Sequence, residues 1–178
     1  MQINKKTLNS IAKKLNIVSA AGRATLEQML IGAPAGYNEE SLTDYLVDQY
    51  KALIESCTSS AASLGATEYN KYREQQTGDI SFQATPENQY DPEITEDIVR
   101  NQIAAACDKK DLGLLAESLG KNIDASVMHA YSGTHYKNAK RDPLKPRYAR
   151  VPTSPTPCKF CLMLASQGFV YLSKETSI

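Results

Sequence analysis

Apolar residues recur at helical spacing along most of the chain. Between residues 3 and 31 they stand mainly three, four or seven positions apart, which predicts a first amphipathic helix. The run Gly-Ala-Pro-Ala-Gly from Gly32 to Gly36 should end this helix. A wider apolar stripe over residues 41–74 predicts a long second helix, for which Ser41 is the expected N-cap. Its run of small residues, 58–63, would allow another helix to cross closely.

The polar stretch 75–92 separates this half from two further predicted helices. Ile80 to Phe82 favour a short extended piece within it. About 18 residues is long for a connection in a compact domain, so we expect this stretch to carry a contact. Asp91, Pro92 and Glu93 are typical of a helix start and predict a third helix over 92–109.

The fourth predicted helix covers residues 111–135, with Asp111 as its cap. Gly113 and Gly120 leave its continuity open, and its helical character fades between Ser132 and Asp142. Residues 1–141 thus form a helical body, arranged either as a bundle or as an extended arm.

The amino-acid composition changes after residue 141, where the sequence becomes rich in proline. Prolines exclude a continuous helix, and they stand at Pro143, Pro146, Pro152, Pro155 and Pro157. Residues 142–178 are therefore predicted to be a Pro-rich basic strap followed by a small Cys-x-x-Cys α/β module. The module would contain a short helix over 162–167 and a strand over 169–172. The fold class expected for the whole chain is mainly α.

Composition and charge narrow the function classes. The formal net charge is zero, so no global field attracts nucleic acid or a membrane. No apolar run approaches the roughly 20 residues of a membrane span, and the N-terminus is amphipathic rather than an apolar signal block. We therefore expect a protein made in the cytoplasm, or assembled there.

Cys57 and Cys107 stand singly in helical patterns and are expected to be small buried residues.

The sequence carries none of the usual enzyme signatures. There is no Gly-rich phosphate loop, Gly-x-Ser-x-Gly elbow or His-Glu-x-x-His motif. The two histidines, His129 and His135, are six residues apart and would point to different faces of a helix. We expect a protein that is not an enzyme.

A basic segment follows the fourth predicted helix. Its cations outweigh Asp142 and are Lys137, Lys140, Arg141, Lys145, Arg147 and Arg150. An extended basic strap suits phosphates or an acidic protein face. Contact with nucleic acid, contact with protein and a solvated linker all remain open.

Cys158 and Cys161 form the sharpest local motif. A two-residue gap lets both sulfurs face one ion, as in half of a tetrahedral zinc site. No Cys or His follows within the sequence, so two further ligands would have to come from elsewhere. A redox pair, reduced structural thiols, a cystine and a half-site completed by other residues are the alternatives.

The string from Arg150 to Tyr171 resembles a known family. Arg150-Val-Pro, Pro157-Cys-x-x-Cys-Leu-Met-Leu-Ala-Ser-x-Gly168 and the aromatic Tyr171 are similar to minor head proteins of tailed bacteriophages, the MuF-like head-morphogenesis group. The resemblance covers roughly the last 30 residues. It implies a few copies inside the head beside the portal, with the portal or major capsid protein as partner and a role in head assembly or in DNA packaging and delivery.

The same resemblance bears on the Cys pair. Similar proteins continue into a His-x-x-Cys-x-Cys segment, which suggests a metal-binding knuckle, whereas this sequence stops before one. Zinc would then need ligands from outside residues 1–178. The expected function is that of a structural minor capsid protein in the virion. The alternative is a zinc-knuckle protein that binds nucleic acid, and a head maturation protease or toxin-type transferase is less favoured.

Overall fold

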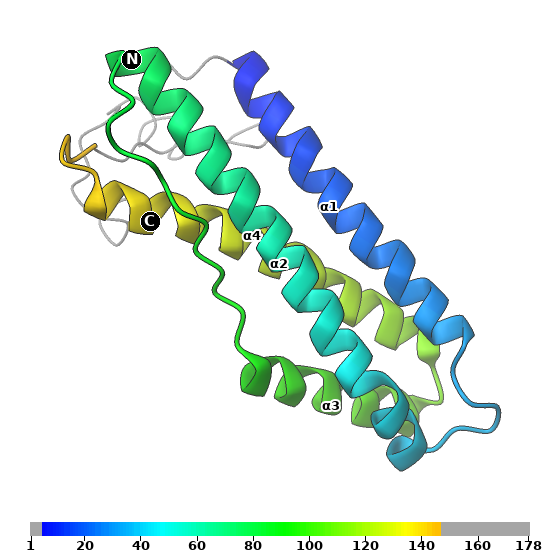
Figure 1. Ribbon diagram of the computed structural model, residues 1–178. Helices are drawn as coiled ribbons and strands as arrows, with labels where there is room; N and C mark the ends of the chain where they lie inside the picture. Colours follow the sequence, from blue (N-terminus) through cyan, green and yellow to red (C-terminus); the bar gives the residue numbers. More distant parts are fainter. Residues whose placement is uncertain (1–4, 147–178) are drawn as a thin grey trace, which may run out of the picture.

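The computed structural model describes residues 5–146 and consists of four helices, with no strand among those residues. The helices are α1 (Lys5–Ile31), α2 (Glu39–Thr77), α3 (Pro92–Lys109) and α4 (Leu112–Arg141). Helices α1 and α2 run side by side in opposite directions, and α4 crosses behind them (Figure 1). The mainly helical prediction is confirmed. Since α2 contacts all three other helices and α1 also contacts α4, the body is a bundle rather than an extended arm.

The start of α2 differs from the prediction. The N-cap is Asn38, not Ser41, because the Asn38 side chain accepts a hydrogen bond of 2.8 Å from the Ser41 backbone N–H. The Ser41 hydroxyl in turn accepts one of 3.0 Å from the Asn38 N–H. This reciprocal capping box satisfies two N–H groups that the first turn leaves without a partner in the helix. Ser41 therefore takes part in the capping box, but as the third residue of α2 rather than as the N-cap.

Helix α3 matches its predicted range, and Asp91 and Asp111 cap α3 and α4 as expected. Helix α4 is continuous through both of its early glycines and runs to Arg141, so the predicted end at residue 135 is wrong. Its last turns bury Thr134, Asn138 and Ala139. Tertiary packing of these residues maintains a helix that local sequence preference alone does not favour.

The core lies where α2 and α4 face one another, with α1 and α3 on either side. Its fully buried members include Leu46 and Tyr50 of α2, Ile103 of α3, and Leu119 of α4. The Tyr50 hydroxyl lies 2.9 Å from both the Leu119 carbonyl oxygen and Asn122 Oδ1, so the buried polar tip has a partner. Burial raises the pKa of Tyr50 well above its ordinary value.

Gly65 brings the backbones of α2 and α4 close together. A Cβ atom at this position would lie 3.1 Å from the Tyr131 carbonyl oxygen and 3.1 Å from Thr134 Cβ, tighter than ordinary packing. This close approach lies at Gly65, two residues beyond the small-residue run 58–63 from which a helix crossing was predicted. Cys57 is buried as expected, whereas Cys107 is only half-buried. None of the described helices combines the length and apolar character that a membrane crossing requires.

Truncation of the core at Leu119 tests this packing. We expect Leu119→Ala to lower the free energy of unfolding by about 2–5 kcal/mol, because the fully buried side chain leaves a cavity beside Tyr50. Ile17→Ala is the control, since Ile17 is 61% exposed and its truncation should change stability by about 0.5 kcal/mol or less. Urea denaturation followed by circular dichroism measures both; equal losses would contradict the assigned core.

Candidate interaction surface at the C-terminal end of α4

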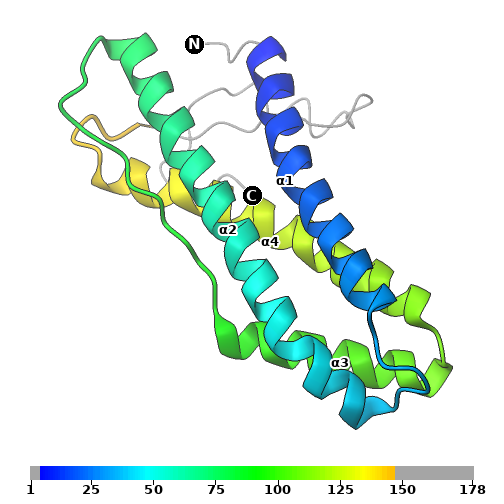
Figure 2. The ribbon, with the colours of Figure 1, turned by 45° about the vertical axis from the view of Figure 1, so that its right-hand side comes forward.

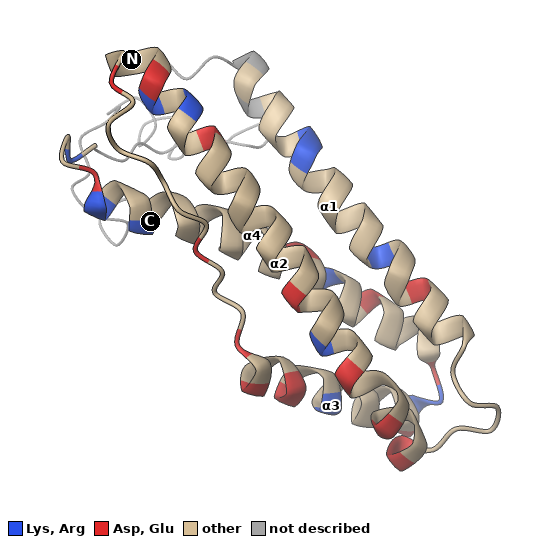
Figure 3. Cartoon of the chain, in the orientation of Figure 1, with Lys and Arg blue, Asp and Glu red and all other residues tan. Residues whose placement is uncertain are grey.

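The structure places four of the predicted basic residues at one end of the molecule. Lys137, Lys140 and Arg141 lie on the last turns of α4, and Lys145 follows four residues after the helix. Figure 3 shows the basic residues at this end of α4 and mostly acidic ones on the first turns of α2 and α3. The other predicted site residues, Arg147, Arg150, Cys158 and Cys161, lie outside the described residues, as do the Pro-rich strap beyond Pro146 and the α/β module.

Two of these cations share one carboxylate. Lys137 Nζ lies 3.5 Å and an Arg141 guanidinium nitrogen 2.8 Å from the carboxylate of Glu87, which belongs to the connection before α3. Burial alone would raise the pKa of Glu87, but Arg141 and Lys137 outweigh it and lower that pKa. The pair therefore fastens the connection to α4, and it also reduces the positive charge that the surface presents.

The other two cations lie at the surface. Lys140 Nζ sits 4.3 Å from the centre of the Tyr136 ring, a cation–π distance. Lys145 Nζ donates to the Lys140 carbonyl oxygen at 3.2 Å. With the exposed face of Lys137, these residues make up a basic patch that we call the α4-end patch: Lys137, Lys140, Arg141 and Lys145.

The connection 78–91 lies in extended form along α2 and α4 (Figure 2). The Thr85 backbone is held by the Asn138 side chain at both polar groups: its N–H donates to Oδ1 at 2.9 Å, and its carbonyl accepts from Nδ2 at 2.8 Å. One turn earlier, Thr134 Oγ1 accepts from the Glu87 N–H at 3.2 Å. These side chains replace the hydrogen bonds that a neighbouring strand would supply.

Helix α2 and Gly133 of α4 make further contacts with the connection, and we call the whole set of contacts the clasp: Asn70, Gly133, Thr134 and Asn138. Asn70 Oδ1 accepts from the Ala84 N–H at 2.7 Å. At Gly133, a Cβ atom would lie only 1.4 Å from the Gln89 side-chain nitrogen, so the glycine leaves the space that Gln89 occupies. The expectation that the long connection carries a contact is therefore confirmed, and the contact is with the helices of the same chain. The expected extended piece forms no strand; the segment runs without a sheet partner.

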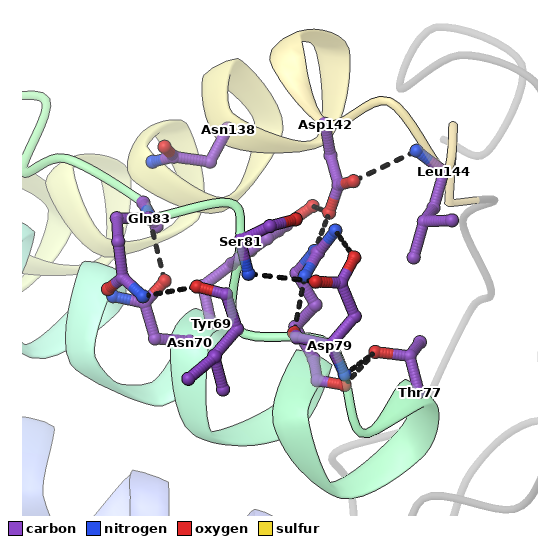
Figure 4. A network of polar contacts seen from close by, with 12 residues as sticks. Tyr69, Asn70, Thr77, Asp79, Ser81, Gln83, Asn138, Asp142 and Leu144 are labelled. Carbon is purple, nitrogen blue, oxygen red and sulfur yellow. Dashed lines mark hydrogen bonds and ion pairs between the residues drawn. The ribbon is translucent and has the colours of Figure 1, made fainter.

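A buried polar network joins the last turns of α2 and the start of this connection to the C-terminal end of α4 (Figure 4). Arg73 Nε donates to Asp142 Oδ2 at 2.9 Å, and the two side chains are only 5% and 2% exposed. The Tyr69 hydroxyl donates to the same oxygen at 3.1 Å, while Asp142 Oδ1 accepts from the Leu144 N–H at 2.9 Å. Arg73 also pairs with Asp79 at 2.8 Å, and this contact strongly lowers the pKa of Asp79. Both carboxylate oxygens of the buried Asp142 therefore accept hydrogen bonds.

His135 lies on the inner side of α4 between tyrosine rings. Its ring centroid is 4.6 Å from that of Tyr131 and 5.7 Å from that of Tyr69, and its Nε2 atom has no hydrogen-bond partner among the described residues. Burial lowers the pKa of His135 to about 4, against a smaller opposing effect of Glu68, which itself pairs with Lys14. His135 is therefore a neutral ring at neutral pH. His129 lies elsewhere, on a cleft beside α3.

The described residues contain no group of three or more His, Cys, Asp or Glu side chains placed to hold a metal ion. His129, His135, Cys57 and Cys107 therefore belong to no such group. The zinc hypothesis therefore depends on Cys158 and Cys161, which lie outside the described range.

Sequence reasoning missed the residues that clasp the connection. The sequence pattern did not single out Asn70, Thr134 and Asn138, because polar residues on a helix usually face water. One signal was present: Thr134 and Asn138 are four residues apart and so share a helix face, next to Gly133. Asp142, assigned only as a counter-charge to the basic segment, is among the most buried polar residues.

Within residues 5–146, these features define a bundle of four helices in which an extended connection is held across two helices and a basic patch lies beside it. Over residues 2–178, nearly its full length, the chain matches the model of the VG15 protein family, and it belongs to that family. VG15 is a viral gene-product family, so the chain is a phage or viral protein. Comparison with curated proteins and with solved structures found no match.

Neutralising Asp142 tests the buried network. We expect Asp142→Asn to lower the urea midpoint clearly, because it leaves the Arg73 guanidinium facing an uncharged group inside the protein. Glu117→Gln makes the same change in an exposed pair, since Glu117 is 63% exposed and bridges Lys121 one turn away on α4. That control should scarcely move the midpoint. A larger effect at Glu117 than at Asp142 would refute the network's role.

His135 gives a pH dependence with a defined sign. The unfolded chain takes up a proton on this histidine below about pH 6.5, and the folded protein only near pH 4, so stability should fall as the pH drops through this window. The loss attributable to His135 is up to about 3 kcal/mol. We expect His135→Phe to remove this part of the dependence, and His129→Phe, at an exposed position, to keep it. Parallel pH profiles of urea unfolding for all three proteins would disprove the assignment.

Proposed function

We propose that this protein is a structural minor head protein of a tailed phage, which binds the portal or the inner capsid. The observation that carries the proposal is the family match over residues 2–178 of a chain that also holds the head-protein string from Arg150 to Tyr171. The match supports viral origin, and the string directs the proposal to the head. Assembly of the head or delivery of its DNA is the process in which we place it.

The geometry of the described residues is consistent with a docking role. The bundle has a packed core, and the network of Arg73 and Asp142 fastens the exit of α4 to the body. The segment that carries the string is thus attached to a firm base, with its first cations at a defined place. A protein that holds a short recognition segment against a large partner needs such a base, because ordering the segment on binding costs conformational entropy.

An acidic protein face is the partner that the proposal assigns to the α4-end patch. Glu87 already pairs with Lys137 and Arg141, so less positive charge remains for any anionic partner than the sequence suggests. Nucleic-acid binding remains the alternative proposal, in which the phosphate contacts would produce a steep salt dependence.

Localisation in the particle is the direct experiment. Phage heads and procapsids are purified, treated with nuclease and analysed by quantitative mass spectrometry. The proposal expects this protein in both, in a small, constant number of copies relative to the major capsid protein. Its absence from both particles would refute the proposal.

Charge variants then test the α4-end patch. We expect Lys137→Gln, Lys140→Gln and Lys145→Gln together to reduce incorporation into heads at least several-fold, because the patch loses three positive charges while Arg141 keeps its contacts with the connection. The control replaces three exposed lysines elsewhere with Gln: Lys13, Lys109 and Lys121. Equal incorporation of the two variants would argue against the patch as the docking surface. Loss of binding to naked DNA without loss from heads would favour the nucleic-acid alternative.

A further inference from the structure

A cleft of about 340 Å³ opens between α2, α3 and α4. Helices α3 and α4 meet at the turn between them and separate toward the start of α3 (Figures 1 and 2). Ile54 of α2 lies at the base, Ile94 and Ile98 of α3 form one wall, and Ala125 and His129 of α4 form the other. Ile94 is 58% exposed although it faces apolar neighbours, so this surface lacks a cover among the described residues.

Acidic residues border the cleft, and we call them its rim. Asp91 lines the cleft, and Glu93 and Asp97 are the chain neighbours of the lining residues Ile94 and Ile98. The nearby cation Lys51 is paired with Glu96. Glu55 of α2 is close enough to Tyr90, another lining residue, to help burial raise the pKa of that tyrosine. Glu55, Glu93 and Asp97 are exposed and take part in none of the ion pairs found within residues 5–146. An apolar cleft with such a rim suits an apolar segment that carries positive charge.

The C-terminal segment of this chain has that chemistry. Residues 1–142 contain 15 basic and 19 acidic residues, a net charge of −4, whereas residues 143–178 contain 5 basic and 1 acidic, a net charge of +4. Within 160–172 the apolar residues are Phe160, Leu162, Met163, Leu164, Phe169, Val170, Tyr171 and Leu172. The zero net charge of the whole protein therefore conceals two parts of opposite sign.

The segment is also long enough to reach the cleft in its own chain. From Ala130, at the cleft, to the end of α4 is 11 helical residues, or about 17 Å. The 13 residues from 147 to 159 span about 40 Å in the extended form that their prolines favour. A short tether of this kind gives the segment a high effective concentration at the cleft.

We propose that residues 160–172 dock in the α2–α3–α4 cleft of the same chain, with the basic flanks of the segment facing the acidic rim. The head-protein string is then covered in the isolated protein and must leave the cleft to contact a partner. This inference concerns the isolated chain, so it stands or fails independently of the proposed role in the phage head.

Photo-crosslinking in the full chain tests the proposal. The photoreactive residue p-benzoylphenylalanine replaces Ala125, an exposed residue of the cleft wall, and, as a control, Ala24, an exposed residue of α1. The expected result at Ala125 is a product of monomer mass in which peptide mapping finds the crosslink within 160–172. At Ala24 we expect at least five-fold less of this product.

Two further variants separate docking from misfolding. Phe160→Ser with Leu164→Ser changes no residue of the four described helices, so we expect it to leave their circular dichroism unchanged and to abolish the crosslink. Glu93→Lys with Asp97→Lys should reduce the crosslink several-fold by reversing the rim charge, whereas Glu27→Lys with Glu117→Lys, at exposed sites elsewhere, should keep it.

Three outcomes would overturn the inference. Products of dimer mass alone would show that a second copy fills the cleft. Crosslinks outside 160–172 would mean that the segment does not dock there. Equal products at Ala125 and Ala24 would indicate random encounters of a loose segment.

Discussion

The close packing of α2 against α4 is the constraint on which the rest of the structure depends. Gly65 lets the two backbones approach, and the buried Tyr50 hydroxyl of α2 donates to the Leu119 carbonyl oxygen of α4. Helix α4 continues to Arg141, and its last turns place Thr134 against Gly65 of α2 and Asn138 against the Thr85 backbone of the connection. Those two side chains then provide the hydrogen bonds that the extended connection requires, so one helix pair organises both the core and the chain that crosses it.

Charge is used twice at the end of α4. Lys137 and Arg141 neutralise Glu87 and so hold the connection in place, while Lys140 and Lys145 face solvent. Deeper inside, Arg73 and Asp142 form a pair that is shielded from water and satisfied by Tyr69. A buried pair of this kind adds little to stability compared with apolar packing. It nevertheless defines one position for the segment that leaves α4, because any other position would leave a buried charge without its partner.

Membership of the VG15 family makes this a viral protein, and the division of charge between body and C-terminal segment suggests how such a protein could serve an assembly. A recognition segment that covers an apolar cleft before assembly protects both surfaces from nonspecific association. Release would expose them together, at a partner that competes for the segment.

The sequence by itself determined the helical character, the range of α3 and the caps at Asp91 and Asp111, because apolar periodicity and capping act over a few residues. It also located the basic patch. The cap of α2 is equally local, since Asn38 and Ser41 are three residues apart, although Ser41 was predicted in place of Asn38. Only the tertiary structure decided that α4 continues past residue 135 and that Asn70, Thr134 and Asn138 hold the connection. These contacts join residues 14 to 53 positions apart along the chain, and spacing within one segment carries no record of them.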